Sequence, residues 1–370
     1  MHVVQVIRAY LRTPRSPHRN VTVLAFSMLL LVGCSGDSST AGEDVNREAV
    51  DPTTSTTITS TTTTAPTTTT TTLVPPIEHD GVPRVLRTTT GVVAPIVGTA
   101  ADGFLVRTPC QDLVVVTDGE PVDRVHVVID PGHGGSETGA ATSGGLGEKT
   151  VNQQVAEQAE VLLQEAGVDV LLTRYADIRV PLVTRAEIAD ALDADLLVSI
   201  HHQSSNVFPT SDEPGVEVYY QQLSEESRRF AGLLVEETRA EFAAFDITWF
   251  AGADAGAVDR PNARTGGDFY GMLRLPETTA VLAELAYMGN PEEVALMESG
   301  ELQSASAQAL AQAVIRFLST NDPGSGFVDS DVVLTTAGSG GGLGGCVDPD
   351  LGATVDLAGD LASDLGEDDG

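Results

Sequence analysis

The amino-acid sequence predicts an α/β fold: a three-layer domain with a mostly parallel sheet and helices on both faces, preceded by a small N-terminal β segment. Two observations predict it. Short apolar runs alternate along the chain with longer segments whose apolar residues recur at helical spacing. The first of these runs, at 125–129, is almost continuously apolar, which is typical of a strand buried on both faces of a parallel sheet. Strands and helices that alternate in this way place helices on both sides of the sheet.

The elements of this domain follow from local signals in chain order. The expected strands are the apolar runs at 125–129, 168–172, 195–200, 216–220, 269–273 and 280–285. The expected helices begin at Glu148, Thr184, Ser224 and Asn290. Gly167 ends the first helix, and residues 184–187 form a capping box that starts the second. Pro291 follows the last start signal, as proline is favoured at the first helical position, and the helices continue to about residue 317.

The composition excludes several classes of protein. The 370 residues include 53 Asp and Glu against 20 Lys and Arg, so the formal net charge is −33. This charge repels phosphate backbones and anionic headgroups, and we predict no nucleic-acid partner. With 41% hydrophobic residues the chain can form a core, and three cysteines are too few for a small disulfide-rich scaffold. We expect no ordinary transmembrane helix, which needs about 20 consecutive apolar residues.

The first 34 residues have the pattern of an export signal. Basic residues at positions 8, 12, 15 and 19 precede an apolar run at 21–32, which is too short to span a membrane. The run ends in Leu31-Val-Gly-Cys34, which resembles the bacterial lipobox, whose cysteine is lipidated and becomes the mature N-terminus. We therefore predict a lipoprotein-type signal peptide at 1–34, a lipid anchor on Cys34 and an extracytoplasmic protein. An ordinary secretory signal that releases the protein is the alternative.

The segments that flank the α/β domain, expected at 123–320, differ from it in composition. Residues 35–80 include a run of almost pure threonine and form a predicted disordered linker, a tether that is a candidate for O-glycosylation. Residues 81–122 contain short apolar runs and predict a small β appendage. Residues 321–370 are rich in Gly and Asp and predict a flexible acidic tail.

Cys110 and Cys346 are the two cysteines that remain once Cys34 is lipidated. Both lie in polar contexts, and an oxidising compartment favours their pairing. A disulfide between them would attach the tail to the segment before the α/β domain. Two unpaired thiols are the alternative.

Polar side chains stand where three expected strands end. His133 follows the first strand, His201 follows the run at 195–200, and Glu284 lies near the end of the run at 280–285. Glu148, at the start of a helix, is a fourth candidate. Each has an ordinary structural explanation, such as a turn residue or a helix N-terminal carboxylate. Together they favour a site, because ligands bind at the carboxyl ends of strands in open α/β sheets. Two imidazoles and a carboxylate suit Zn²⁺ with an open fourth position.

Several short words of the sequence occur in a defined order across the same domain. The most specific is Val-Ile-Asp-Pro-Gly-His-Gly-Gly at 128–135. The others are Glu148-Lys149, Leu172-Thr-Arg174, Arg185, Ser199-Ile-His201, Gly215-Val-Glu-Val-Tyr219, Leu273-Arg274, Val281-Leu-Ala-Glu284 and Asn290-Pro291. Over about 125–318 this set resembles the zinc-dependent N-acetylmuramoyl-L-alanine amidases of the type-3 amidase family.

The resemblance implies a function for these residues. It implies zinc held by His133, Glu148 and His201, with Glu284 as the catalytic carboxylate. It also implies an enzyme that hydrolyses the amide between N-acetylmuramic acid and L-alanine with a zinc-activated water. Peptidoglycan is then the expected substrate, and the anchored protein would face the cell wall. The resemblance identifies no protein partner.

The resemblance is incomplete near the substrate. Gln203 stands where the family usually has asparagine, and Thr279 replaces a proline. We expect Gln203, Arg264 and Arg274 to contact substrate, since arginines of an acidic protein are candidates for binding stem-peptide carboxylates. Two other functions stay open: a different zinc peptidase or hydrolase on the same residues, and a lipoprotein that binds peptidoglycan without cutting it.

Overall fold

The structure is a computed structural model that describes residues 74–203, 215–247, 249–250, 255–334 and 341–355. The chain divides into two compact units, and every described residue belongs to the unit formed by residues 1–7 and 72–370. The predicted signal peptide, Cys34 and most of the predicted linker lie outside the described residues. Among the described helices, none has the length and apolar content required to cross a membrane.

An antiparallel sheet combines five strands from the N-terminal part of the chain with one from the C-terminal part. Its strands are β1 (Val85–Arg87), β2 (Val93–Ala100), β3 (Gly103–Arg107), β4 (Leu113–Val116), β5 (Glu120–Val122) and β12 (Thr354–Val355). Their order is β12-β4-β3-β2-β1-β5, and every neighbouring pair is antiparallel. The first five lie within the segment where the sequence predicts a β appendage.

The central sheet is mostly parallel, as the sequence predicts. Its strands are β6 (Val127–Pro131), β7 (Val170–Leu172), β8 (Leu196–Gln203), β9 (Glu217–Tyr220), β10 (Gly256–Asp259) and β11 (Ala280–Tyr287). They lie in the order β10-β9-β11-β8-β6-β7, and only the β9–β11 pair is antiparallel. The carboxyl ends of β6, β8 and β11 therefore meet at one edge of the sheet.

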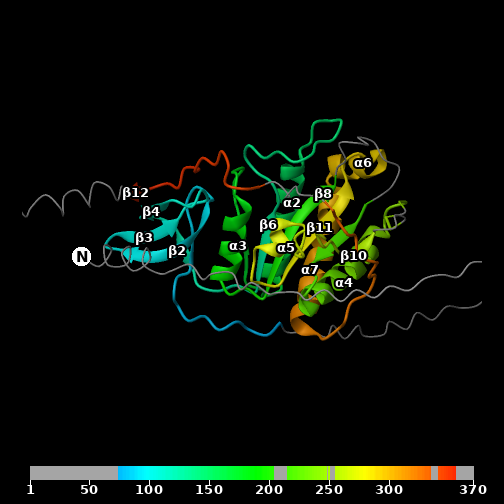
Figure 1. The fold of residues 1–370 in the computed structure, drawn as a ribbon, viewed down its shortest axis with the longest axis horizontal. Coiled ribbons are helices and arrows are strands. Elements are labelled where there is room, and N and C mark those ends of the chain that lie inside the picture. The colour runs from blue at the N-terminus through cyan, green and yellow to red at the C-terminus, as the bar shows by residue number, and fades with distance from the viewer. Residues whose placement is uncertain (1–73, 204–214, 248, 251–254, 335–340, 356–370) are drawn as a thin grey trace, which may run out of the picture. The chain divides into compact units, whose positions relative to one another are not determined.

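Helices cover both faces of this sheet. They are α2 (Glu148–Glu165), α3 (Leu182–Ala191), α4 (Glu225–Phe242), α5 (Gly271–Arg274), α6 (Pro291–Ser299) and α7 (Glu301–Ser319). One core packs α2, α4 and α7 against the sheet through residues such as Val155, Phe230 and Leu310. A second core packs α3 and α5 on the other face through Ile188 and Met272, and the N-terminal sheet lies beside α3 (Figure 1). This three-layer arrangement confirms the predicted fold class.

Two elements differ from the sequence prediction. Residues 269–273, expected to form a strand, instead turn into the single-turn helix α5, whose first turn includes the bond from Arg274 N to Tyr270 O at 3.1 Å. The sheet position beside β9 is taken by β10, a strand of four residues in a segment where we expected no strand. The prediction was wrong because a short strand is decided by its partner strand rather than by its own sequence.

The predicted capping box at 184–187 is also wrong. Helix α3 starts two residues earlier, at Leu182, after Pro181 as N-cap in an extended conformation. Thr184 is therefore inside the helix, and its hydroxyl donates to the carbonyl of Pro109 at 2.8 Å. The hydroxyl that we expected to cap the helix instead contacts the region of the N-terminal sheet. The cap predicted at Ser224 is present, since its hydroxyl oxygen accepts from Ser227 N.

The described part of the C-terminal segment is held by the rest of the unit, which differs from the expectation of a flexible tail. Val328 N donates to Ala257 O at 3.0 Å, so the segment after α7 runs along β10. Further on, Cys346 is joined to Cys110 by a disulfide, and β12 extends the N-terminal sheet. Backbone bonding and the disulfide outweigh the glycine-rich composition on which the expectation depended.

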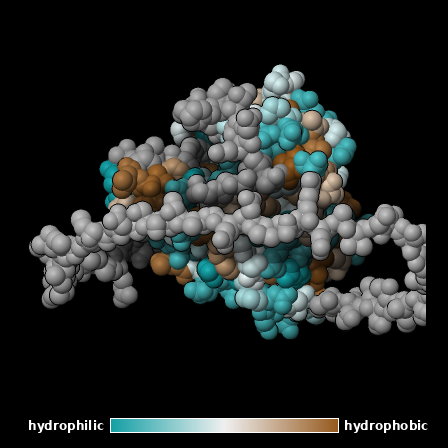
Figure 2. Space-filling model, turned by 90° about the vertical axis from the view of Figure 1, so that its right-hand side faces the viewer, coloured by the Kyte–Doolittle hydropathy of each residue, from teal (hydrophilic) through white to brown (hydrophobic). Residues whose placement is uncertain are grey.

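The described surface carries isolated large apolar side chains rather than a continuous apolar face. Examples are Leu223, which is 93% exposed, and Leu334, which is 78% exposed. Figure 2 shows hydrophobic residues in separate areas among hydrophilic ones on the face that it presents. Scattered exposed apolar residues of this kind are ordinary for a protein surface.

Candidate metal centre and its cleft

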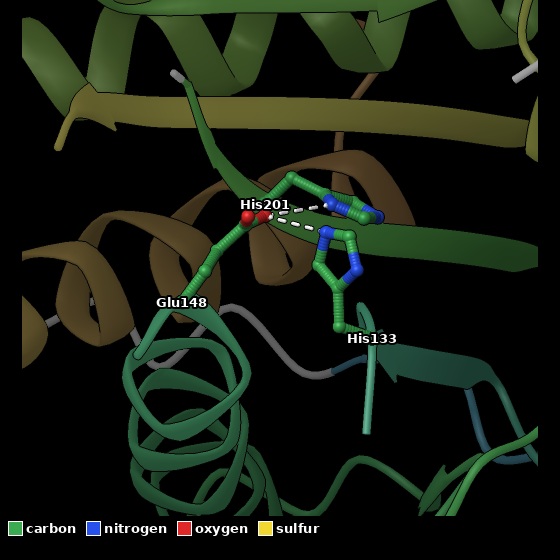
Figure 3. A group of neighbouring side chains, drawn as sticks. All are labelled: His133, Glu148 and His201. Carbon is green, nitrogen blue, oxygen red and sulfur yellow. Dashed lines mark hydrogen bonds and ion pairs between the residues drawn. The ribbon is translucent and has the colours of Figure 1, made fainter. Parts of the chain in front are cut away.

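Three side chains from three elements converge at the carboxyl edge of the central sheet. His133 comes from the loop after β6, Glu148 opens α2 and His201 lies near the end of β8 (Figure 3). The Oε1 atom of Glu148 lies 3.0 Å from His133 Nε2 and 3.0 Å from His201 Nδ1. One potential ligand atom from each residue lies within 4.8 Å of the other two. The sequence prediction that these strand and helix ends meet therefore agrees with the geometry.

The loop after β6 turns sharply to direct the imidazole of His133 towards Glu148. His133 has φ of +60°, a left-handed conformation that few residues with a side chain adopt. Gly134 and Gly135, which follow it, also have positive φ values. Glycine accepts this conformation without steric cost, so the Gly-rich sequence after the strand permits the turn.

Two further glycines allow the ligand side chains to approach closely. A Cβ atom on Gly132 would lie 2.3 Å from His201 Nε2. A Cβ atom on Gly139 would lie 2.4 Å from Glu148 Oε2 and 2.7 Å from His133 Cδ2. Side chains at either position would occupy the space that the three converging groups need.

The carboxylate of Glu148 is ionised in this setting. Burial by itself would raise the pKa of Glu148, but hydrogen bonds from the rings of His133 and His201 outweigh it and hold the pKa well below its usual range. The second oxygen, Oε2, accepts from Ala140 N at 2.9 Å. This bond fixes the orientation of the carboxylate while Oε1 faces the two histidines.

A buried ion pair supports the loop that carries His133. The guanidinium of Arg185 donates to Asp130 Oδ1 at 2.5 Å, to the carbonyl of Pro131 at 3.0 Å and to the carbonyl of His133 at 2.6 Å. Asp130 also accepts from the hydroxyls of Thr173 and Ser199. Although burial opposes ionisation, the charge of Arg185 and these hydrogen bonds lower the pKa of Asp130.

A second buried arginine links the loop to helix α2. Arg174 donates to the carbonyls of Pro131 at 3.0 Å and Gly132 at 3.2 Å, and to the carbonyl of Lys149 at 3.0 Å. Burial, followed by the nearby charge of Arg185, lowers the pKa of Arg174 to about 10, so it remains charged at neutral pH. One side chain thus connects the two segments that carry His133 and Glu148.

Glu284 brings a second carboxylate to the same cleft. It lies on β11 directly beside His201 of the parallel strand β8 and opposite Glu217 of β9. Burial raises the pKa of Glu284 well above its usual range, the charges of Glu148 and Glu217 raise it further, and Arg260 acts in the opposite direction. The Oε2 atom of Glu284 is buried without a hydrogen-bond partner among the described residues. Burial and the neighbouring carboxylates thus disfavour the charged form of Glu284.

These groups face a cavity of about 400 Å³. His133, His201 and Glu284 line its polar part, and Leu182, Met272 and Leu282 contribute apolar surface. Tyr270 and Glu137 line it as well, together with Gly341 from the C-terminal segment. The size and the mixture of polar and apolar groups are those of a small-molecule binding site.

The three residues predicted to contact substrate do not line this cavity. Arg274 donates to the carbonyls of Asp268 and Phe269, and the backbone of Arg264 is bonded to Asn262. Gln203 lies at the end of β8, where its carbonyl accepts from Met288 N. The prediction of Gln203, Arg264 and Arg274 as lining residues of this cavity is therefore not supported.

The sequence analysis did not predict several other residues that line the cavity. Tyr270 and Met272 belong to the segment that we expected to be a strand, and Gly341 belongs to the expected tail. Arg185 was a word of the family resemblance without an assigned role. That word was the only signal in the sequence that Arg185 would be part of the site, where it is buried beside Asp130.

The two adjacent histidines of β8 have different surroundings because side chains alternate across a strand. His201 faces Glu148, whereas His202 is buried and its Nδ1 lies 2.7 Å from the Oδ1 atom of Asn152 on α2. Burial lowers the pKa of His202 to about 4, so its ring is neutral. Of the pair, only His201 reaches the cleft.

An α/β sheet with two histidines and a carboxylate converging at its carboxyl edge, beside a second carboxylate, has the features of a metal-dependent hydrolase. Residues 127–316, just over half of the chain, match the family described as N-acetylmuramoyl-L-alanine amidase, and the chain belongs to this family. The resemblance inferred from the short sequence words is thereby confirmed.

Individual relatives agree with this assignment. The chain is 28% identical over 233 residues to the N-acetylmuramoyl-L-alanine amidase AmiC of Neisseria meningitidis, covering 54% of each chain. It is 30% identical over 217 residues to AmiA of Escherichia coli, covering 52% of this chain and 75% of that relative. The first match therefore spans about half the length of the meningococcal protein.

The chain is also similar to a solved structure. The N-acetylmuramoyl-L-alanine amidase AmiC2 of Nostoc punctiforme is 32% identical, with a TM-score of 0.44, over 52% of this chain and 96% of that one.

Proposed function

We propose that the protein hydrolyses the amide bond between N-acetylmuramic acid and L-alanine in peptidoglycan. The observation that carries this proposal is that His133, Glu148 and His201 converge in the cleft that Glu284 also lines, in a chain of an amidase family. The relatives named as amidases support the same reaction.

The cofactor that we infer is a zinc ion held by His133, Glu148 and His201. Two imidazole nitrogens and one carboxylate oxygen are ligand types that zinc takes, with a further position open for water or substrate. The ionised state of Glu148 and the space left by Gly132 and Gly139 fit such an ion. Zinc in such a site acts as a Lewis acid on a carbonyl and lowers the pKa of water to about 7.

Glu284 is then the group that moves the proton. A water molecule attacks the lactyl carbonyl carbon, and Glu284 takes a proton from that water. As the amide C–N bond breaks, Glu284 delivers the proton to the nitrogen. The second proton of the water then passes to the released amine, so the products are a lactyl carboxylate and L-alanine with a protonated amino group. A carboxyl whose pKa is raised towards neutral suits a group that both accepts and donates a proton.

Digestion of purified muropeptides, with the cleaved bond identified by mass spectrometry, tests this proposal. Glu284→Gln keeps the shape of the side chain and removes its proton transfer, and we expect a loss of about 10²–10⁴-fold in turnover with zinc retained. Glu277→Gln, at an exposed glutamate, is the matched control and should stay active. Cleavage at another bond would reject the amidase proposal, and normal turnover in Glu284→Gln would move the proton transfer elsewhere.

We also propose that the protein acts at the cell wall while attached to the membrane through lipidated Cys34. The order of basic residues, short apolar run and Leu31-Val-Gly-Cys34 supports an anchor, and the threonine-rich segment after it would act as a tether. Cys34→Ala should release the protein to the medium or block its maturation, whereas Ser35→Ala should leave it with the membrane. Unchanged membrane fractionation of Cys34→Ala and no lipid mass on Cys34 would reject the anchor.

A further inference from the structure

The C-terminal segment 341–355, which we call the strap, reaches the rim of the candidate active-site cleft. Gly341 lines the cavity, and its carbonyl accepts from Leu182 N at 2.9 Å. Leu182 is the first residue of α3 and also lines the cavity. The strap therefore supplies an acceptor to a helix N-terminal N–H that has no partner within the helix, at the edge of the cleft.

The contact at the rim is close and involves a second pair of groups. A Cβ atom on Gly341 would lie 2.6 Å from Leu182 Cγ, and Gly341 has φ of +76°. Beside it, the guanidinium of Arg179 donates to the carbonyl of Gly342 and pairs with Glu137, at 2.8 Å. Glu137 lines the same cavity. Backbone at positions 341 and 342 thus contacts Leu182 directly and is linked to Glu137 through Arg179.

The other end of the strap is fixed to the N-terminal sheet. Cys346 is joined to Cys110, and Cys110 N donates to Asp348 Oδ1 at 2.7 Å. Leu351 is buried against the N-terminal sheet, and β12 pairs with β4. Figure 1 shows this red segment passing one end of α3 and ending at β12 beside β4. The bond from Leu182 N, the disulfide and β12 thus hold the strap against α3 and the N-terminal sheet.

We propose that the strap is a fixed part of the wall of the substrate cleft and determines which substrates enter it. This inference rests on the proposed amidase function. A cavity of about 400 Å³ is at the small end of ligand-binding cavities, so it fits one sugar–peptide junction. On this proposal, a stem peptide that carries a second, cross-linked peptide meets the strap at Gly341. The enzyme therefore prefers muropeptides with a single, uncross-linked stem.

The first experiment releases the strap and compares substrates. The full chain and the Cys110→Ser/Cys346→Ser double variant are given monomeric and cross-linked muropeptides, and kcat/KM is measured for each. We expect the ratio of cross-linked to monomeric kcat/KM to rise about tenfold in the double variant, chiefly through KM, a size of effect that steric pocket contacts reach. An unchanged ratio, in a variant whose strap is shown to be released, overturns the proposal.

Release of the strap is measured by hydrogen exchange, which does not depend on enzyme activity. Leu182 N is bonded to the strap, so hydrogen exchange at this amide should be slow in the parent protein and faster in the double variant. Fast exchange at this amide in the parent protein would mean that the strap is not seated at the rim, which also overturns the proposal. If the parent protein cleaves neither muropeptide, the amidase function fails, whereas the exchange data still show whether the strap is seated.

A pair of glycine variants tests the contact with the disulfide intact. Gly341→Ala places a methyl group against Leu182, whereas Gly345→Ala adds one at a strap residue with φ of +66° and nothing within 4 Å. Both changes impose similar backbone strain, but only the first displaces the strap from the rim. Gly341→Ala should raise the cross-linked to monomeric ratio, and Gly345→Ala should not. Equal ratios in the two variants would contradict a wall at Gly341.

Discussion

Arg185 connects the buried carboxylate of Asp130 to the backbone of His133: its guanidinium lies 2.5 Å from Asp130 Oδ1 and 2.6 Å from the carbonyl oxygen of His133. Both charged side chains are almost completely buried, at 2% and 0% exposure. Because Asp130 holds the Arg185 guanidinium in place, the guanidinium in turn fixes the backbone of His133, a ligand of the proposed zinc site. Groups that orient a metal ligand in this way affect metal affinity without touching the ion.

We predict that Arg185→Lys weakens zinc binding by about 10–100-fold, the usual effect of losing a group that orients a ligand. A lysine ammonium cannot reproduce the planar fork that serves Asp130 and the His133 carbonyl together. Competition with a chromophoric chelator measures the affinity, and circular dichroism checks the fold. Arg87→Lys, in the N-terminal sheet, is the control and should bind zinc normally. Equal affinities in both variants would mean that Arg185 does not orient His133.

His133→Ala and His201→Ala should each lose bound zinc, because a site of three protein ligands keeps little affinity with two. Metal content after dialysis, measured by mass spectrometry, checks this. His79→Ala removes an exposed histidine that pairs with Asp123 and should retain one zinc per chain. Full occupancy in both ligand variants would reject the assigned ligand set.

Gly132→Ala should abolish zinc binding by steric clash alone. Its new Cβ atom would meet the His201 ring at 2.3 Å, so the imidazole has to leave its position. Gly147→Ala is the matched control, because the nearest atom to its Cβ is 4.0 Å away and its φ of −85° suits alanine. Zinc titration should give tight binding for Gly147→Ala and none for Gly132→Ala. Tight binding by Gly132→Ala would show that the space beside the His201 ring is not needed.

Glu293 should make the protein less stable as the pH rises. Burial raises its pKa to about 8, against an ordinary value of 4.5, although the hydrogen bond from Tyr287 N acts in the opposite direction. Between these two values the folded state binds more protons than the unfolded state. The free energy of unfolding therefore falls with increasing pH, by up to about 1.4 kcal/mol per pH unit from this group. The loss begins near the lower value and is complete above about pH 8.

Glu293→Gln should remove this contribution. Urea unfolding at pH 6 and at pH 8.5 compares the variant with the parent protein, and the parent should lose more stability across this interval. Glu301→Gln, at the exposed first residue of α7, should follow the parent. Parallel curves for all three proteins would show that the proton on Glu293 is not held in the folded state.

Much of the fold and of the candidate site could be predicted from the sequence. The continuous apolar run of β6 and the helical spacing after Glu148 are local signals, so they identify a buried strand and the helix beside it. His133, His201 and Glu284 follow from the same signals, because parallel strands bring their carboxyl ends to one edge. The family words add Glu148, whose role at a helix start is otherwise ambiguous.

The tertiary structure decided what depends on residues far apart in the chain. β10 forms because it can pair with the free edge of β9. Residues 269–273 lead into α5 because β10 already occupies that edge. Arg274 donates to carbonyls of its own loop region, and neither it nor Arg264 lines the cleft. The strap reaches Leu182 because a disulfide and β12 hold its far end. Periodicity in the sequence reports which face of an element is buried, whereas the choice of neighbour is set by packing, close backbone approach and long-range pairing.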